Sequence, residues 1–223
     1  MTEEAADSDL ESQVRRLDPD RWLASRFVAD QQARADLIAL YAYDHELGRA
    51  PRVASNPLVG EIRLTWWREA LDEAFDGRPV RKHPTAVAIA DAIRRRSLPR
   101  APLEAMIDAR LIEVDGGPST VEQAIAWADG VGGGAMRAAA LILDPAAPEA
   151  ATMLAGRAWG LGRYPQVAGA VDAARAARVE ARRAVKGLSV AAFPAVLPLV
   201  AQAPGSDLAK RLRLTWASAT GRV

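Results

Sequence analysis

Hydrophobic residues recur every three to four positions along most of the chain, and prolines and glycines divide it into segments. Alanine, leucine and arginine, which favour helices, are abundant, whereas β-branched runs with a period of two are lacking. The pattern therefore predicts a single all-α domain. Helices are expected at residues 8–17, from residue 19, and at 31–48, 55–75, 84–96, 101–115, 119–143, 148–163, 166–186 and 206–219.

Two of these helices carry a recognisable apolar stripe, which is expected to face the core. In the helix at 31–48 the stripe consists of Leu37, Leu40, Tyr41 and Leu47. In the helix at 55–75 the expected stripe consists of Leu58, Ile62, Trp66, Ala70 and Leu71.

The helix at 119–143 begins with a capping box and is interrupted by glycines at 130 and 132–134. Ser119 or Thr120 would cap the helix, with Glu122 or Gln123 completing the box. The glycines resemble a phosphate-binding loop only superficially, because no strand precedes them and no Lys-Ser/Thr pair follows. Close packing against neighbouring helices is the preferred explanation for them.

Composition narrows the choice of function class. The 223 residues carry a net charge of +1, which gives no argument for a nucleic-acid partner. The absence of cysteine excludes disulfides, zinc-thiolate sites and a thiol nucleophile. The acidic N-terminus does not resemble a signal or transit peptide. The longest apolar stretch, at 188–204, contains several prolines, which would make it a poor membrane-spanning helix. A cytoplasmic protein without a membrane span is expected.

The cluster Asp44-His45-Glu46 ends the apolar part of the helix at 31–48. Consecutive helical residues point about 100° apart, so these three side chains cannot all bind one ion. A solvated helix end is the simpler interpretation of this cluster.

A second acidic group, Asp72, Glu73 and Asp76, lies near the end of the helix at 55–75. Asp72 and Asp76 share a face, and that spacing could hold Mg²⁺. A solvated acidic turn before Gly77 is the commoner explanation. His83, in the following basic loop, is expected to be a surface histidine.

Two basic segments stand out, at residues 94–100 and 171–186. The first fits the preference of cations for helix C-termini. The second suits either a membrane surface, an acidic partner or a plain solvated face. Its cations are Arg175, Arg178, Arg182, Arg183 and Lys186.

Several blocks, in the right order, resemble the squalene/phytoene synthase family of head-to-head prenyl transferases. Residues 20–50, with the step Tyr41-Ala42-Tyr43, are similar to the family's first block, and residues 64–93 to the next one. Residues 107–115, 127–143 and 155–163 resemble later helices. The resemblance covers most of residues 18–200, and implies a helical domain around a central cavity at 18–223, preceded by an extension at 1–17.

Active members of that family hold Mg²⁺ on two aspartate-rich motifs, and the metal neutralises the diphosphate leaving group. This chain departs from both motifs. The places of the first motif fall at Gly48, Arg49 and Arg52, and an arginine inverts the charge of a metal ligand. Asp44 and Glu46 are the carboxylates that remain in this degenerate motif. The segment expected to carry the second motif is missing, because Arg163 is followed directly by Tyr164-Pro165.

A non-catalytic branch of the family, related to complex I assembly factor 6, shares two features with this chain. One is Glu46-Leu47 in place of the aspartates, and the other is the block Phe193-Pro194-Ala195. The resemblance implies a pseudoenzyme without a metal or other cofactor that supports respiratory complex I assembly. Its expected partners are a complex I subunit or intermediate, a prenyl or lipid ligand, and a peripheral membrane contact at the inner face of the inner membrane.

Two alternatives remain open at this point. One is a divergent Mg²⁺-dependent prenyl transferase of isoprenoid biosynthesis, and the other is a shortened remnant that exposes apolar surface. The prenyl transferase would use the acidic groups Asp72, Glu73, Asp76, Asp108, Glu113 and Asp115.

Overall fold

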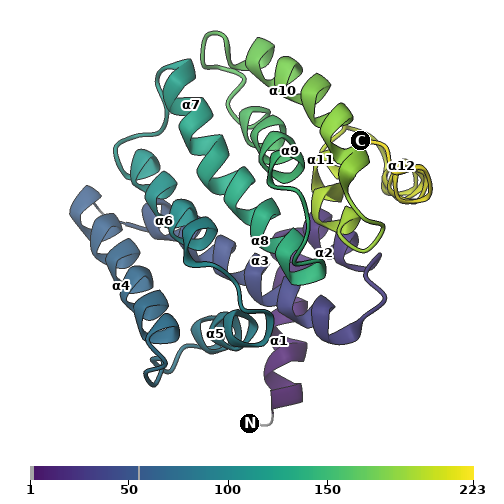
Figure 1. Ribbon diagram of the computed structural model, residues 1–223. Helices are drawn as coiled ribbons and strands as arrows, with labels where there is room; N and C mark the ends of the chain where they lie inside the picture. Colours follow the sequence, from purple (N-terminus) through teal and green to yellow (C-terminus); the bar gives the residue numbers. More distant parts are fainter. Residues whose placement is uncertain (1–2, 55) are drawn as a thin grey trace.

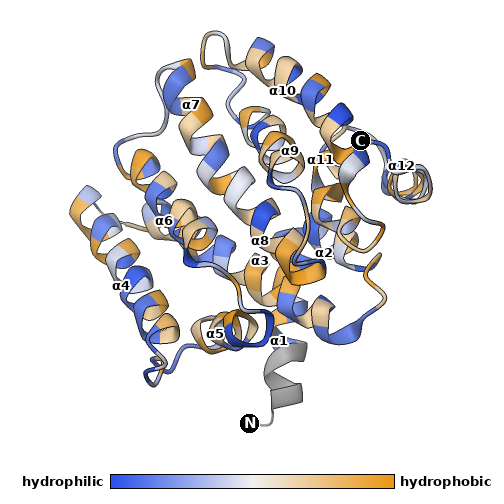
Figure 2. Ribbon diagram, in the orientation of Figure 1, coloured by the Kyte–Doolittle hydropathy of each residue, from blue (hydrophilic) through white to orange (hydrophobic). Residues whose placement is uncertain are grey.

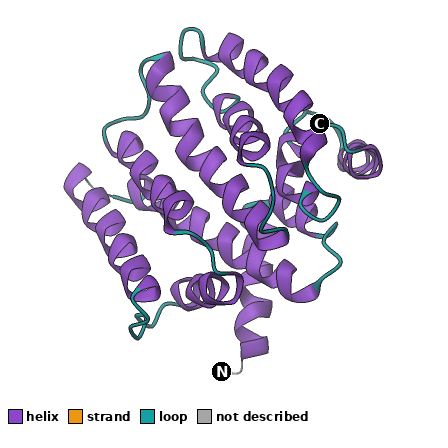
Figure 3. Cartoon of the chain, in the orientation of Figure 1, coloured by secondary structure: helices purple, strands orange, loops and turns teal. Residues whose placement is uncertain are grey.

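The computed structural model describes residues 3–54 and 56–223, and its regular elements there are all helical (Figures 1 and 3). The predicted all-α class is therefore confirmed. The helices are α1 (Glu3–Leu17), α2 (Pro19–Ser25), α3 (Gln31–Arg52), α4 (Pro57–Phe75), α5 (Pro84–Arg96), α6 (Arg100–Val114), α7 (Val121–Ala128), η1 (Asp129–Gly133), α8 (Gly134–Leu143), α9 (Glu149–Leu161), α10 (Ala170–Ala184), η2 (Val185–Gly187), η3 (Phe193–Val196), α11 (Leu197–Ala201) and α12 (Asp207–Thr220).

Local sequence signals set most helix starts. Asp18 and Asp30 cap α2 and α3 by accepting hydrogen bonds from backbone N–H groups of the first turn. Thr120 caps α7 by accepting from the N–H of Gln123. The Gln123 side chain accepts a bond at 2.9 Å from the N–H of Ser119, one residue before the cap, so the predicted residues form a variant of the capping box. The first residue expected in the helix at 55–75, Ser55, lies outside the described residues.

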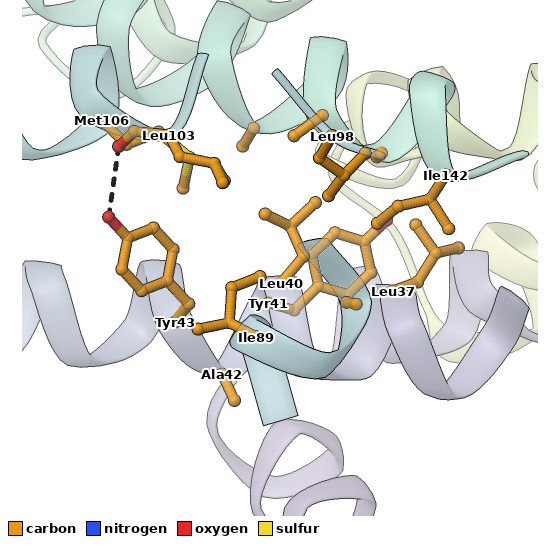
Figure 4. Packing of buried hydrophobic residues seen from close by; sticks show 14 of the residues in the cluster. Leu37, Leu40, Tyr41, Ala42, Tyr43, Ile89, Leu98, Leu103, Met106 and Ile142 are labelled. Atoms are coloured by element: carbon orange, nitrogen blue, oxygen red, sulfur yellow. Dashed lines mark hydrogen bonds between the residues drawn. The ribbon is translucent and has the colours of Figure 1, made fainter. Parts of the chain in front are cut away.

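Helix α3 is the central element of the larger core cluster. It packs against α1, α4, α5, α6 and α8, and its predicted apolar stripe is buried. Figure 4 shows Leu37, Leu40 and Tyr43 meeting side chains from α5, α6 and α8. The Tyr43 hydroxyl donates a hydrogen bond to the Leu103 carbonyl of α6 at 3.2 Å. Helix α3 is 22 residues long. It continues through Pro51 to Arg52, beyond the end at residue 48 that the sequence predicted.

The stripe predicted for the helix at 55–75 is partly wrong. Leu58 and Ile62 are 63% and 58% exposed, whereas Gly60, Leu64 and Trp67 are buried. Trp67, not Trp66, packs edge-on against Tyr43 with ring centroids 5.5 Å apart. Because the two tryptophans are adjacent, the hydrophobic pattern alone does not decide which one points inward. The orientation of α4 about its axis depends on which of them is buried. Ala70 and Leu71 are buried as predicted.

Other helix boundaries also differ from those expected from the sequence. The helix expected at 166–186 begins at Ala170, after Gly169 in a left-handed conformation. Figure 2 shows hydrophobic and hydrophilic turns alternating along α10 and α4, as expected for helices with one face toward solvent.

Glycines let the segment α7–η1–α8 pass very close to two neighbouring helices. A Cβ added at Gly132 would lie 2.1 Å from the Gly156 carbonyl oxygen of α9. On the other side, a Cβ added at Gly130 would lie 2.6 Å from the Ala105 carbonyl oxygen of α6. The predicted packing role of these glycines is thus confirmed, and the π-helical turn η1 lies at this double contact.

Replacing Gly132 with alanine should be strongly destabilising, because its Cβ would meet backbone atoms that cannot rotate away. We expect Gly132→Ala to lower the free energy of unfolding by about 3 kcal/mol, measured by urea denaturation. Gly187→Ala is the matched control, since its Cβ would lie 3.7 Å from Pro148, an ordinary contact. Equal stability of the two variants would contradict the close-packing account.

Candidate functional site

A cavity of about 670 Å³ opens where the C-terminal half of α3 meets α2, α6, η1 and α9. One wall is charged and the other is largely aromatic. The ionisable side chains of the lining are Asp18, Asp20, Arg21, Asp44, His45, Arg52, Arg110, Glu113 and Arg163. The remaining side chains of the lining include Leu17, Trp127, Val131, Trp159 and Tyr164.

Asp44 is the centre of the charged wall. It is only 4% exposed, so the interpretation of this position as a solvated helix end is wrong. One carboxylate oxygen accepts a short hydrogen bond from Arg21 of α2, and the other accepts one from Arg110 of α6 at 2.8 Å. Arg110 also pairs with Glu113, which accepts a bond from the Trp127 indole at 2.7 Å. We call Arg21, Asp44, Arg110 and Glu113 the ionic cluster.

Within the ionic cluster, Asp44 and Arg21 favour each other's charged state. Burial alone would raise the pKa of Asp44, but the charges and hydrogen bonds of Arg21 and Arg110 outweigh it and lower that pKa. Burial would also lower the pKa of Arg21, yet Asp44 raises it overall. The two carboxylates and two guanidinium groups balance each other in charge, and Arg21 also pairs with Asp18 at 3.6 Å.

The aromatic wall carries two of the cavity's cations. The guanidinium groups of Arg21 and Arg163 lie 4.6 Å and 4.0 Å from the ring centre of Trp159. Arg163 forms no ion pair with a described residue, and Arg52 likewise forms none. Burial, with a contribution from the charge of Arg21, lowers the pKa of Arg163. The cavity therefore offers two cations that lack a partner from residues 3–54 and 56–223.

The degenerate first motif lies at the edge of this cavity. Gly48 occupies the place that the resemblance gives to the first aspartate, and a Cβ there would lie 3.1 Å from the Arg110 guanidinium carbon. Arg110 thus fills the space into which that aspartate would project. Glu46 pairs with Arg49 at 3.6 Å, one turn farther along, while Arg52 lines the cavity.

The acidic residues of the enzymatic alternative do not face one another. Asp72 is paired with Arg100 at the first residue of α6, whereas Glu113 and Asp115 lie at the other end, about 20 Å away along the axis. Within the described part of the chain, no group of three His, Cys, Asp or Glu residues could hold a metal ion.

The three other acids of that alternative are also paired with arginines. Glu73 pairs with Arg81 at 2.6 Å, and Asp76 pairs with Arg78 at 3.1 Å and with Arg100 at 3.9 Å. Asp108 pairs with Arg68 across the α4–α6 contact. His83 is half-buried beside Trp66 and Trp67, so it is not the simple surface residue that was expected.

Comparison with known proteins identifies the class. The fold is an isoprenoid synthase-like all-α fold, and the sequence matches the family "Squalene/phytoene synthase" over residues 14–166. The chain belongs to this family, as the resemblance of its sequence blocks indicated.

Among curated proteins, the chain is similar to "NADH dehydrogenase (ubiquinone) complex I, assembly factor 6" from Bos taurus. The two are 26% identical over 102 residues, which is 46% of this chain and 30% of the relative. The match thus spans less than a third of that protein's length. No helix within residues 3–54 and 56–223 is long and apolar enough to cross a membrane.

Arg21, Arg110, Trp159 and Arg163 were not singled out as site residues by sequence reasoning. Arg21 lies on α2, Arg110 on α6 and Trp159 on α9, and these three positions are far apart in the chain. Arg163 follows Trp159 by four residues, just after the end of α9. The available signal was the polar residue Asp44 within a run of apolar residues of α3, which requires buried partners.

Removing the charge of Asp44 should be costly, because two buried guanidinium groups would lose their counter-charge. We expect Asp44→Asn to lower the free energy of unfolding by about 3 to 5 kcal/mol. The control Asp108→Asn breaks an exposed pair and should cost at most about 1 kcal/mol. Chemical denaturation of both variants measures the difference, and a similar small loss in each would refute a structural role for the ionic cluster.

Acid should remove the stabilisation that the charged Asp44 carboxylate provides. The pKa of Asp44 is lower in the folded chain than its value of about 3.9 in an unfolded one, so protonation favours unfolding. The stabilisation is complete above about pH 5 and should fall as the pH drops below 4. Thermal unfolding between pH 2 and 7 should show a smaller acid loss in Asp44→Asn than in the unmodified chain.

Proposed function

We propose that this chain is a non-catalytic member of the squalene/phytoene synthase family that supports respiratory complex I assembly. The observation that carries the first part is the position of Arg110, whose guanidinium lies over Gly48 and binds Asp44. A cation fixed to the protein occupies the place where active relatives would direct an aspartate toward Mg²⁺.

The chemistry explains why this replacement argues against catalysis. Ionising an allylic diphosphate needs a dense positive charge that is held close to the leaving group. Here Arg21 and Arg110 are already committed to Asp44 and Glu113. Arg52 and Arg163 can attract a phosphate. An arginine is not a metal ligand, however, so it cannot replace the carboxylates that hold Mg²⁺.

The similarity to complex I assembly factor 6 supports the second part. It is a partial match, and the proposed partner is a complex I subunit or assembly intermediate. The block Phe193-Pro194-Ala195 is buried in η3, so in this chain it contributes to the core and not to a docking surface. The contact with such a partner must therefore be made elsewhere on the molecule. A cytoplasmic location at the inner face of the inner membrane belongs to the same proposal.

The cavity suits a ligand with an apolar body and an anionic group. Trp127 and Tyr164 pack edge-on with ring centroids 4.8 Å apart and provide the apolar side. Arg163, over the ring of Trp159, and Arg52 of α3 provide cations in the lining of the same cavity. We propose that a prenyl-like or lipid molecule binds here without a metal ion.

Deleting the gene should lower the amount of assembled complex I. We expect reduced NADH:quinone activity in membranes of the deletion strain, restored by a plasmid copy. The control is succinate:quinone activity, which should not change. Normal levels of complex I in the deletion strain would count against the assembly role.

Purified protein should release no diphosphate from farnesyl or geranylgeranyl diphosphate in the presence of Mg²⁺. The measurement is diphosphate release beside a heat-treated sample, in protein shown to unfold cooperatively. Release that depends on Mg²⁺ and is lost in Asp72→Ala would instead support the divergent prenyl transferase.

A further inference from the structure

A groove of about 660 Å³ lies between α10 and α12, on a different part of the molecule from the cavity at Asp44. We call it the basic groove. Its charged side chains are all cations: Arg178, Arg182, Arg183, Lys186, Arg213 and Arg222.

The cations of the basic groove form no ion pair with an aspartate or glutamate among the described residues. Arg178 and Arg213 donate instead to backbone carbonyls of Leu199 and Ala203, at 3.2 Å and 2.6 Å. Arg182 donates to the main-chain oxygen of Val223 at 2.9 Å. Glu180, the carboxylate within this part of α10, contributes to the electrostatics of Arg157 on α9 and does not line the groove. The groove is therefore a concentrated, unneutralised positive surface.

An apolar ridge runs along the outer side of α12, beside the basic groove. Leu208, Leu212 and Trp216 recur at every fourth residue and are 67%, 62% and 56% exposed. Only Leu214 and Ala217 of this helix are buried, so α12 is attached to the molecule by a narrow contact. Figure 1 shows α12 at the edge of the fold, on the side away from α4.

We propose that the face formed by α10 and α12 docks on an anionic lipid surface. Phosphate groups would neutralise the cations of the basic groove, while Leu208, Leu212 and Trp216 enter the headgroup region. A tryptophan at the border between charged and apolar residues is typical of such interfaces. The proposal rests on the membrane location proposed above, but not on complex I as the partner.

A lipid surface explains these side chains better than an acidic helix bound in the groove. Such a helix would cover Val200 and Trp216, which line the groove, but leave Leu208 and Leu212 in water. A membrane covers the cations and the whole ridge together. An acidic helix and an anionic lipid surface match the charge of the basic groove equally well. The exposed apolar ridge therefore favours the lipid surface.

The test is co-sedimentation of the full chain with vesicles. One set contains phosphatidylcholine with roughly one third phosphatidylglycerol, and the other contains phosphatidylcholine alone. We expect binding to the anionic vesicles only, decreasing steeply as salt is raised. Arg182→Glu/Arg183→Glu should weaken binding at least about tenfold, and Leu212→Ser/Trp216→Ser should weaken it as well.

Matched controls lie on α4, which also exposes a cation and an apolar side chain. Arg63→Glu and Ile62→Ser change the same kinds of exposed residue and should bind vesicles like the unmodified chain. No binding, equal binding to neutral vesicles, or equal losses in the α4 controls would each overturn the proposal. The salt and lipid dependence of the unmodified chain decides the matter even if a variant folds poorly. Loss of vesicle binding with normal complex I levels would leave the assembly role untouched.

Discussion

The bond between Asp44 and two arginines is the interaction on which the site depends. Asp44 is on α3, Arg21 on α2 and Arg110 on α6, so one carboxylate joins three helices. Removing such charges from water is expensive, and the arrangement is tolerable only because both carboxylate oxygens are engaged and Glu113 balances the second guanidinium. Each of these partners must therefore be present for the others to be buried, which makes the ionic cluster an all-or-none feature of the fold.

The ionic cluster also changes how the family's metal site can be understood. A metal ion between helices has two physical effects: it balances acidic side chains, and it offers a positive charge that can be shared with a ligand. In this chain the first effect is provided by Arg21 and Arg110, which are covalently part of α2 and α6. Their charge is used within the protein, so little of it remains for a diphosphate. Arg52 and Arg163 are the lining cations without an ion-pair partner among the described residues, and Arg163 lies over the aromatic ring of Trp159. This arrangement supports the proposal that the cavity holds a ligand without ionising it.

The sequence predicted the fold class, most helices and the family, because helical periodicity, caps and block order are local signals. It predicted the buried face of α3 for the same reason. It predicted the wrong tryptophan of the pair Trp66 and Trp67 as buried, because Tyr43 on another helix packs against Trp67. The degenerate motif on α3 stays a prediction, whereas the solvated environment expected for Asp44 was wrong. Burial of Asp44 depends on Arg21 and Arg110, which lie 23 and 66 residues away in the chain. Ion pairs between residues so far apart produce no periodic pattern in the sequence.

Helix α9 links the two surfaces for which we propose binding roles. One side of α9 carries Trp159 to the cavity, and the helix also packs against α10, which forms one wall of the basic groove. Its position is fixed by the backbone contact between Gly132 and Gly156, where even one methyl group cannot be accommodated. Because that contact has no room to slide, a ligand in the cavity cannot move α9 toward η1. A direct connection between the cavity and the α10–α12 face runs through Trp159, whose carbonyl accepts a hydrogen bond from Gln202 at 3.0 Å, two residues after Val200 of the groove lining.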